Sequence, residues 1–304
     1  MSANQPTLNI THVSHHGWDA QLLSNNLVEV IVVPALNRIM QFRFVGGQDV
    51  FWENRRMDGK PPDPHSPSWC NFGGDKPWPA PQSDWEKVTA RDWPPPAGFD
   101  AKPAQAGLAE QDIILTSSVD PHYGIQMTRR ITLHPDQPAM TVSTEYQKVS
   151  GGPVRVGVWV VTQLRDPQRA FMVHNTASNL PGGYIQILPD APQDFDVRDG
   201  FISLKRAHYS EAQIASDAST LVWMDQENVL RIQAPREPEA DYPNRGSSAV
   251  IFTAKDPFPY VELETFGPLH VMRPGDRIEN TNTYALFRRS ESDPFAQARK
   301  VITD

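Results

Sequence analysis

The sequence predicts an all-β protein, an antiparallel β-supersandwich with few short helices. Short segments rich in Val, Ile, Thr and aromatic residues recur along the chain, and turns that contain Pro or Gly separate them. Helical patterns between these segments are scarce, so alternating βαβ units are not indicated. No linker-like stretch divides the 304 residues, and we therefore expect a single domain over residues 1–304.

Charge and composition limit the partners. The formal net charge is −8 and the pI is about 5.6, which argues against nucleic acid and anionic membranes. The single cysteine, Cys70, excludes an internal disulfide and suits a reducing compartment. The polar segment Met1 to Ile10 lacks the apolar core of a signal peptide, so we expect a cytoplasmic protein. The alternative is a secreted protein whose signal peptide has been removed. Nothing in the composition indicates an oligomeric state.

The first strands follow from turn chemistry. Leu22 to Val33 has Ser24-Asn25-Asn26 between two apolar runs, which predicts a hairpin, and Pro34 ends its second strand. Further strands are expected over residues 39–45, 113–118, 125–133, 140–149 and 154–164, the last of them apolar enough for the centre of a sheet. Shorter strands are expected over residues 184–188, 201–204, 221–224, 229–232, 249–254, 260–265 and 278–287. At the C-terminus, Asp293 could cap a short helix whose first turn holds Pro294.

The stretch from Asn71 to Trp85, N-F-G-G-D-K-P-W-P-A-P-Q-S-D-W, has the strongest chemical character. Its glycine pair and its three alternating prolines predict a stiff, ordered loop, because an inner strand would need the missing backbone donors. Aromatic faces beside amides, carboxylates and an ammonium suit a polyhydroxylated ligand with apolar C–H faces, which is a sugar. The alternative is a Trp/Pro plug that closes one end of the core. The candidate ligand-binding residues here are Asn71, Asp75, Lys76, Trp78, Gln82 and Trp85.

A second stretch, Tyr260-Val261-Glu262-Leu263-Glu264-Thr265, is typical of a strand. Alternation places Glu262 and Glu264 on one face and the apolar Val261 and Leu263 on the other. On a solvent-facing side this would be an ordinary edge strand. If the carboxylates line a concavity, burial and mutual repulsion raise their pKa values towards the range of a general base. The pattern does not decide between these two interpretations.

Other chemistry is weakly indicated. His174 is a candidate acid or hydrogen-bond donor, whereas His15 and His16 are expected to be solvated. No metal-ligand spacing, nucleophile elbow or phosphate loop is present, so we expect neither a metal nor a cofactor. Arg38 flanks the end of a predicted strand and is a further candidate for ligand binding.

Three stretches resemble the galactose mutarotase-like, or aldose 1-epimerase-like, superfamily. They are the early L-S-N-N-L-V-E-V-I-V-V-P-A-L-N-R-I-M-Q-F-R-F, the central Y-G-I-Q-M-T-R-R-I-T-L-H-P-D-Q-P-A-M-T-V-S-T-E-Y-Q-K-V-S and the late Y-V-E-L-E-T-F-G-P-L-H-V-M-R-P-G-D. The stretch G-G-D-K-P-W-P-A-P-Q is similar to the uncharacterised DUF4380 branch. The similarity spans about residues 22–287 and implies a β-supersandwich.

The resemblance also implies roles for residues. A glutamate base and a histidine acid interconvert sugar anomers in true mutarotases, and Glu264 best fits the base, with Glu262 second. Lys76 lies nearest to the family's sugar-binding arginine. This chain has Thr162 and Gln163 where mutarotases have the central histidine, so the acid role would fall to His174 or Lys76, and Gln163 becomes a ligand-binding candidate.

Two functional hypotheses follow. The first is a carbohydrate-active enzyme, most simply an aldose 1-epimerase. The second is a noncatalytic sugar-binding or structural domain, and lyase or hydrolase chemistry on the same fold is a third possibility. In each case we expect a small-molecule carbohydrate as the ligand and a cleft that Trp78 and Glu264 share.

Overall fold

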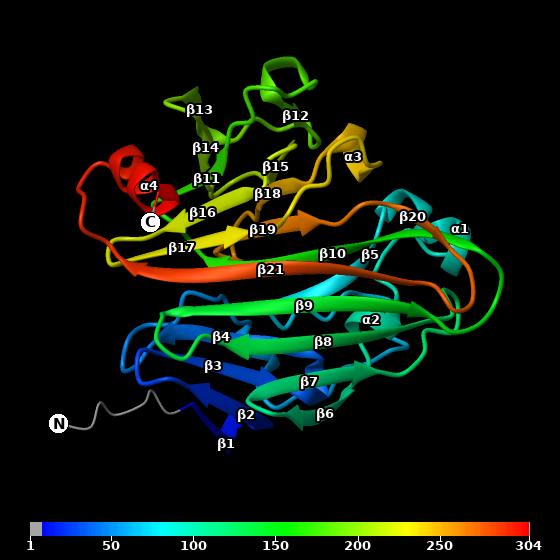
Figure 1. Cartoon of the computed structure of the whole chain (residues 1–304). Helices are drawn as coiled ribbons and strands as arrows, with labels where there is room; N and C mark the ends of the chain where they lie inside the picture. Colours follow the sequence, from blue (N-terminus) through cyan, green and yellow to red (C-terminus); the bar gives the residue numbers. More distant parts are fainter. Residues whose placement is uncertain (1–7, 304) are drawn as a thin grey trace.

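Two large antiparallel sheets pack face to face in the computed structural model, which describes residues 8–303 (Figure 1). The all-β prediction is therefore confirmed. Residues 1–7 of the polar N-terminal segment, and Asp304, lie outside the described part of the chain. Among the described residues, none of the helices is long and apolar enough to cross a membrane.

The first sheet has eleven strands. In spatial order they are β1 (Asn9–His15), β2 (Trp18–Ser24), β3 (Val28–Val33), β4 (Arg38–Phe44), β5 (Asp75–Ala80), β10 (Val154–Arg165), β19 (Tyr260–Phe266), β18 (Ala249–Thr253), β15 (Ala212–Ser216) and β12 (Tyr184–Gln186), with β20 (His270–Met272) paired to one end of β10. The predicted central position of the 154–164 strand is confirmed, since β10 lies between β5 and β19.

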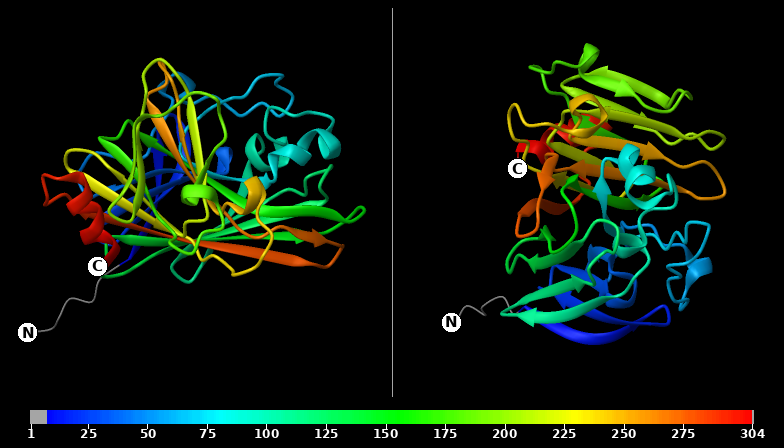
Figure 2. Two further views of the ribbon diagram at one scale, coloured as in Figure 1. Left: turned by 90° about the horizontal axis from the view of Figure 1, so that it is seen from above. Right: turned by 90° about the vertical axis from the view of Figure 1, so that its right-hand side faces the viewer.

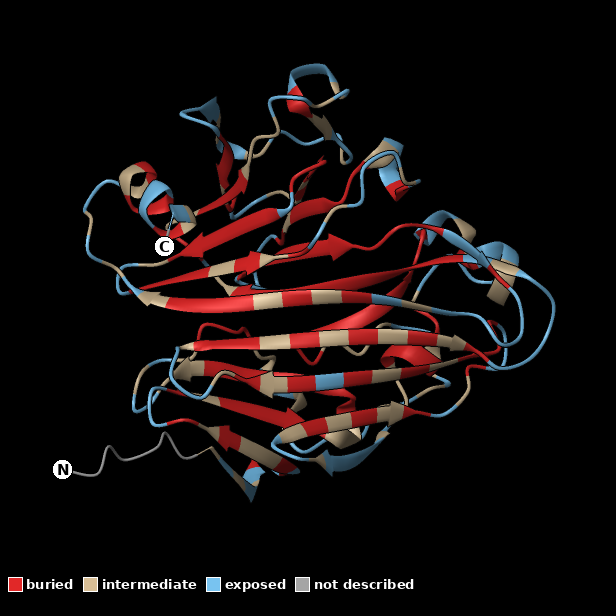
Figure 3. Cartoon of the chain, viewed as in Figure 1, coloured by how far each residue is buried: buried red, intermediate tan, exposed pale blue. Residues whose placement is uncertain are grey.

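The second sheet has ten strands and covers one face of the first (Figure 2). In spatial order they are β13 (Gln193–Arg198), β14 (Phe201–Lys205), β11 (Arg169–Val173), β16 (Thr220–Met224), β17 (Asn228–Gln233), β21 (Arg277–Arg288), β9 (Ala139–Lys148), β8 (Ile125–Leu133), β7 (Asp112–Ser117) and β6 (Ala104–Ala109). In β8 and β9 buried residues alternate with more exposed ones, so one face of this sheet packs on the core and the other meets solvent (Figure 3).

Helices are few and short, as the sequence predicts. They are α1 (Trp85–Thr89), α2 (Ala97–Asp100), α3 (Pro243–Gly246) and α4 (Pro294–Thr303), with 3-10 turns η1 (Pro34–Leu36), η2 (Arg55–Met57), η3 (Gln82–Asp84) and η4 (Pro181–Gly183). The predicted C-terminal cap is confirmed, because the Asp293 carboxylate accepts a hydrogen bond from the Ala296 amide at 2.8 Å.

The prediction of a loop over Asn71 to Trp85 is wrong for residues 75–80, which form β5. Lys76, Trp78 and Ala80 alternate with Pro77 and Pro79, and the strand pairs with β10 over its whole length. On its other side β5 pairs with β4 at Asp75 alone. Successive residues of a strand direct their backbone groups to opposite edges. Pro77 and Pro79 are two positions apart, so both can face the nearly unpaired edge.

The central strands are buried on both faces, and this positions the site. All residues of β5 and β19, and residues 156–164 of β10, are buried. One face packs against the second sheet in the main core. The other face lies beneath residues 52–74 and 81–103, which we call the covering loops (Figure 2).

Candidate functional site

The site begins with three rows of side chains on the face of the first sheet that lies under the covering loops. Strand register brings these residues side by side across β5, β10, β19 and β18. The rows are Trp78–Trp159–Phe266, Lys76–Val161–Glu264 and Gln163–Glu262–Phe252. The opposite-facing Val261 and Leu263 belong to the core between the sheets, so the predicted alternation along β19 holds.

A cavity of about 430 Å³ opens above these rows. Its lining residues are Trp69, Asn71, Trp78, Gln82, Trp93, Trp159, Leu188, Glu211, Gln213, Phe252, Phe258, Tyr260, Glu262 and Glu264. Five of the residues singled out from the sequence are in this set: Asn71, Trp78, Gln82, Glu262 and Glu264. Trp78 and Glu264 thus border one cavity, and β19 is an inner strand rather than a solvent-facing edge.

A cluster of indole rings forms one wall. The Trp78 ring meets the Trp159 ring edge to face at a centroid distance of 5.0 Å and the Trp69 ring at 5.7 Å. Trp159 in turn stacks on Phe266 at 5.2 Å. Edge-to-face and offset-stacked contacts are the preferred aromatic arrangements, so the rings fix one another.

Asp100, at the end of α2, anchors this wall from behind. Its carboxylate accepts hydrogen bonds from the indole N–H of Trp78 at 2.8 Å and of Trp69 at 2.9 Å. It also pairs with the buried Arg38 guanidinium at 2.6 Å. Arg38 donates a second hydrogen bond to the Gly73 carbonyl at 2.8 Å. One carboxylate therefore orients two cavity-lining rings.

Glu264 lines the cavity and is buried, with 1% of its surface exposed. The Trp159 indole donates to its Oε2 at 2.9 Å, and the Gln213 amide donates to its Oε1 at 3.4 Å. Burial raises the pKa of Glu264 well above its ordinary value, and the charge of Glu262 raises it further. The hydrogen bond from Trp159 acts on this pKa in the opposite direction.

Glu262 differs from Glu264 because it has a cation close by. Burial raises the pKa of Glu262, but the Lys76 ammonium, 3.9 Å away, opposes that rise. Lys76 is itself fully buried, and this burial lowers its pKa to about 7. Its ammonium lies 5.4 Å from the Trp78 ring centroid and 5.7 Å from that of Trp69.

Several polar atoms in this region make no hydrogen bond of normal geometry within the protein. They are Nζ of Lys76, both amide atoms of Gln163 and Oε1 of Glu262. Buried polar groups without partners are costly, at about 1–3 kcal/mol each. Of these three residues only Glu262 lines the cavity, so only its Oε1 is placed to meet a ligand there. Gln163 is the direct cross-strand neighbour of Glu262, which places these groups together.

Three predicted ligand-binding residues lie elsewhere. Asp75 faces the core between the sheets, where Arg129 pairs with it and Thr162 and Tyr284 each donate a hydrogen bond to it at 2.7 Å. Arg38 is held by Asp100 behind the indole wall. Trp85 is fully buried and donates to the Pro79 carbonyl, so it belongs to the plug-like part of this segment.

His174 is not among the residues that line the cavity. It follows β11 in the second sheet and packs against Gly183, where an added Cβ would lie 2.1 Å from its Nε2. The expectation that it shares a site with Glu264 is corrected accordingly. Lys76 and Gln163, also expected to bind the ligand, are both fully buried and lie beneath the cavity rather than on its wall.

Sequence reasoning missed several lining residues, among them Trp69, Trp93, Trp159, Glu211, Gln213 and Tyr260, and also the anchor Asp100. For Trp159 a signal existed. Trp159, Val161 and Gln163 lie at every second position of the central strand and so share one face, and this strand pairs with the strand of Glu264. For Asp100 no local pattern indicated a role.

The comparisons with known proteins identify relatives. A family model described as "Domain of unknown function (DUF4380)" matches residues 20–287. No curated protein matches the chain.

Solved structures show the same fold at low identity. A TPR-domain containing protein from Parabacteroides distasonis is similar with a TM-score of 0.60 and 15% identity; the match covers 90% of this chain but only 48% of that one, so this chain spans about half its length. A galactose mutarotase-like protein from Lactobacillus casei matches with a TM-score of 0.57 and 7% identity over 92% and 100% of the two chains. A galactose mutarotase related enzyme from Lactobacillus acidophilus gives 0.53 and 8% over 90% and 98%.

Proposed function

The chain belongs to the DUF4380 family, whose function is unknown, and we propose that its cavity binds a neutral saccharide. The observation that carries this proposal is the combination of an aromatic wall with carboxylate and amide groups in one cavity, among them Glu262, Glu264 and Gln213. Indole faces suit the apolar C–H faces of a pyranose, and carboxylate and amide groups suit its hydroxyls. The mutarotase-like fold agrees with such a ligand.

Charge favours a neutral sugar over a phosphorylated or acidic one. The cavity is lined by three carboxylates, those of Glu211, Glu262 and Glu264, and by no Lys, Arg or His side chain among the described residues. The buried Lys76 offsets one of these charges from beneath. An anionic ligand would meet the remaining negative charge of these carboxylates, with no cation on the described cavity wall to bind it, in a site of low dielectric constant.

A second candidate function, aldose 1-epimerase activity, is favoured by the electrostatics of the glutamate pair. Two neighbouring buried carboxyl groups do not ionise together easily, so one keeps its proton while the other is charged. Such a pair supplies an acid and a base at once. Lys76 is the strongest influence favouring the charged form of Glu262, whereas its effect on Glu264 is smaller than that of the Glu262 charge and of the hydrogen bonds from Trp159 and Gln213.

This asymmetry suggests Glu262 as the base and Glu264 as the acid, the reverse of the assignment that the family resemblance implies. The base would take the proton of the anomeric hydroxyl while the acid protonates the ring oxygen, and the C1–O5 bond breaks to give the open aldehyde. Rotation about C1–C2 and the reverse transfers would close the other anomer. The reaction needs no histidine.

Binding and catalysis can be tested separately. Tryptophan fluorescence, titrated with neutral mono- and oligosaccharides and with a sugar phosphate, measures binding. We expect a neutral saccharide to bind and the phosphate to bind more weakly. If no neutral saccharide changes the fluorescence or competes for the cavity, the binding proposal fails.

Polarimetry of freshly dissolved aldoses measures mutarotation. Removing a general acid or base costs about 10²–10⁴-fold in rate, so Glu262→Gln and Glu264→Gln should each lose most of the activity while keeping saccharide binding. With Glu262 as the base and Glu264 as the acid, Glu262→Gln loses the acidic limb of the pH profile and Glu264→Gln the alkaline limb. Glu86→Gln, an exposed residue of α1 outside the cavity, is the matched control. Wild-type binding without any rate acceleration would leave a noncatalytic binding protein.

A further inference from the structure

The turn between β1 and β2 carries chemistry that the cavity does not use. His16 and Gly17 form this turn with positive φ values of 51° and 94°. The turn packs against the segment that follows η2, where a Cβ on Gly17 would lie 3.0 Å from the Gly59 Cα. The indole of Trp18 donates to the Lys60 carbonyl at 2.8 Å. Two segments about 40 residues apart in sequence are thus held together here.

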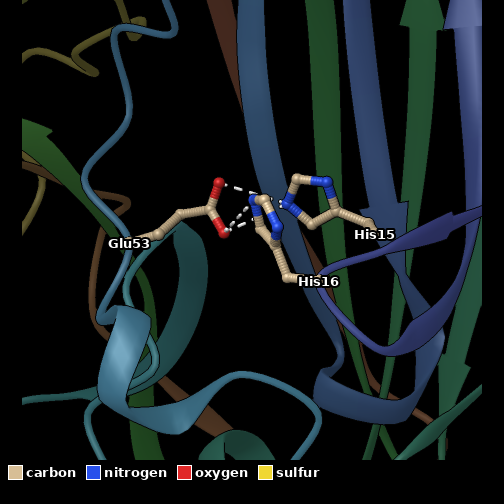
Figure 4. A group of neighbouring side chains, drawn as sticks. All are labelled: His15, His16 and Glu53. Atoms are coloured by element: carbon tan, nitrogen blue, oxygen red, sulfur yellow. Dashed lines mark hydrogen bonds and ion pairs between the residues drawn. The ribbon is translucent and has the colours of Figure 1, made fainter.

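Three potential metal ligands converge at this junction. Figure 4 shows the His15 and His16 rings beside the Glu53 carboxylate, and one ligand atom from each residue lies within 4.8 Å of the other two. His15 Nε2 is 3.0 Å from Glu53 Oε2, and His16 Nε2 is 3.8 Å from the same oxygen. The expectation of solvated imidazoles is wrong for His15, which is 6% exposed, and the Glu53 side chain is 10% exposed.

We propose that His15, His16 and Glu53 bind a divalent transition metal ion of the zinc class. Imidazole and carboxylate ligands suit Zn²⁺, and bond lengths of about 2.0–2.1 Å at a tetrahedral angle separate ligand atoms by about 3.3 Å. The separations of 3.0 and 3.8 Å from Glu53 lie on either side of this value, and the two imidazoles offer nitrogen atoms within 4.8 Å of each other, so side-chain rotations can bring the three ligand atoms to tetrahedral spacing. Three protein ligands leave one coordination position for water or an external ligand.

Arg55 makes the proposal specific. Its guanidinium donates to Nε2 of His16, the lone pair that the metal would need. Arg55 is 58% exposed and also pairs with Asp58 at 3.0 Å, so it can leave the histidine and keep this second partner. Metal and Arg55 therefore compete for one atom, whereas a simple His15–Glu53 ion pair would involve no such competition.

The metal would fix the β1–β2 turn to the start of the covering loops. Glu53 directly follows Trp52, whose ring lies 4.5 Å from that of Tyr260 on the cavity wall. The site is separate from the cavity, because none of the three ligands lines it.

The test uses the full chain without an affinity tag, stripped of metal by a chelator. Calorimetric titration with ZnCl₂ should give one site per chain, and Co²⁺ should give the visible absorption of a four-coordinate site. Mg²⁺ and Ca²⁺, which prefer all-oxygen ligands, should not compete. Wild-type protein that binds no Zn²⁺, or binds Mg²⁺ equally well, overturns the proposal.

Four variants separate a metal site from a structural ion pair. Changing even an outer-shell partner of a metal site costs about 10–100-fold in affinity, so His16→Gly, which suits the positive φ, and Glu53→Gln should each weaken Zn²⁺ binding at least tenfold. Arg55→Gln should strengthen it. His12→Ala, at an exposed position of β1, is the control and should not change it. Unchanged affinity in His16→Gly, or equal loss in His12→Ala, contradicts the assignment, and thermal melts without metal report on folding.

Discussion

Replacing Asp100 by Asn tests how the cavity wall is held. The substitution keeps the shape of the side chain but removes its charge and turns one acceptor oxygen into a donor. Arg38 is fully buried, and the Gly73 carbonyl is its other hydrogen-bond partner, so it would keep its charge without the carboxylate that pairs with it directly. One of the two indole donors, from Trp69 or Trp78, would lose its acceptor.

The magnitude follows from these contacts. Removing one partner of a buried ion pair costs about 3–5 kcal/mol, and a buried donor left without an acceptor costs about 1–3 kcal/mol. The two terms share one carboxylate and do not add fully. We expect Asp100→Asn to lower the free energy of unfolding by about 3–5 kcal/mol, a large part of the 5–15 kcal/mol typical of a folded protein.

The assay is urea unfolding followed by tryptophan fluorescence, with far-UV circular dichroism as a second probe. Asp92→Asn is the matched control, an exposed aspartate in the same loop, and should stay within about 0.5 kcal/mol of the wild type. The double variant Arg38→Met/Asp100→Asn should recover about 1–3 kcal/mol relative to the sum of the single changes, because no buried charge remains unpaired. A loss below about 1 kcal/mol for Asp100→Asn, or strict additivity, would show that Asp100 does not hold the wall in this way.

Three further predictions concern the same region. The pKa of Glu264 is raised above its ordinary 4.5, so the folded state binds the carboxyl proton more tightly than the unfolded state does. The stability that this proton contributes is complete below pH 4.5 and is lost as the pH rises through the folded-state pKa. Glu264→Gln should therefore melt at a higher temperature than wild type at pH 8, with the difference closing towards pH 4; a lower melting temperature at pH 8 would contradict this. Trp159→Phe removes the donor to the Glu264 carboxylate, so the pKa of Glu264 followed by ¹³C NMR should rise further, and an unchanged midpoint would count against the hydrogen bond. Gly73→Ala places a Cβ 2.2 Å from the Trp52 carbonyl oxygen, so its free energy of unfolding should fall by more than the roughly 1–3 kcal/mol of a strained φ. Gly46 also has a positive φ but has open space around it, so Gly46→Ala measures the backbone strain alone in the same urea assay.

The strand pattern was predictable because turn residues and apolar alternation are local signals. The hairpin through Ser24-Asn25-Asn26 and the central 154–164 strand both follow from residues within a few positions of each other. β5 was not predictable in this way. Its prolines normally exclude an inner strand, and only the tertiary arrangement, in which β4 pairs with β5 at a single residue, removes the objection.

For the site, chemical character along the sequence was a partial guide. The alternation of Glu262 and Glu264 gave their shared face, but whether that face lies in solvent or in a cavity depends on loops about 200 residues away. Asp75 and Lys76 are adjacent and equally polar, yet strand alternation sends Asp75 to Arg129 in the core and Lys76 to Glu262 below the cavity. The anchor Asp100 has no local signal, because its partners come from other elements.

Occupation of the indole-lined cavity by a neutral saccharide can be observed by ¹H–¹⁵N NMR of the tryptophan indole groups during saccharide titration. Trp78 and Trp159 line the cavity, whereas the indoles of Trp18 and Trp223 donate to the Lys60 and Arg165 carbonyls outside it. Tryptophan-to-phenylalanine variants assign the signals. We expect the Trp78 and Trp159 signals to shift in a saturable way while those of Trp18 and Trp223 stay fixed. The absence of any shift across a panel of neutral saccharides, or shifts confined to Trp18 and Trp223, would contradict saccharide binding in this cavity.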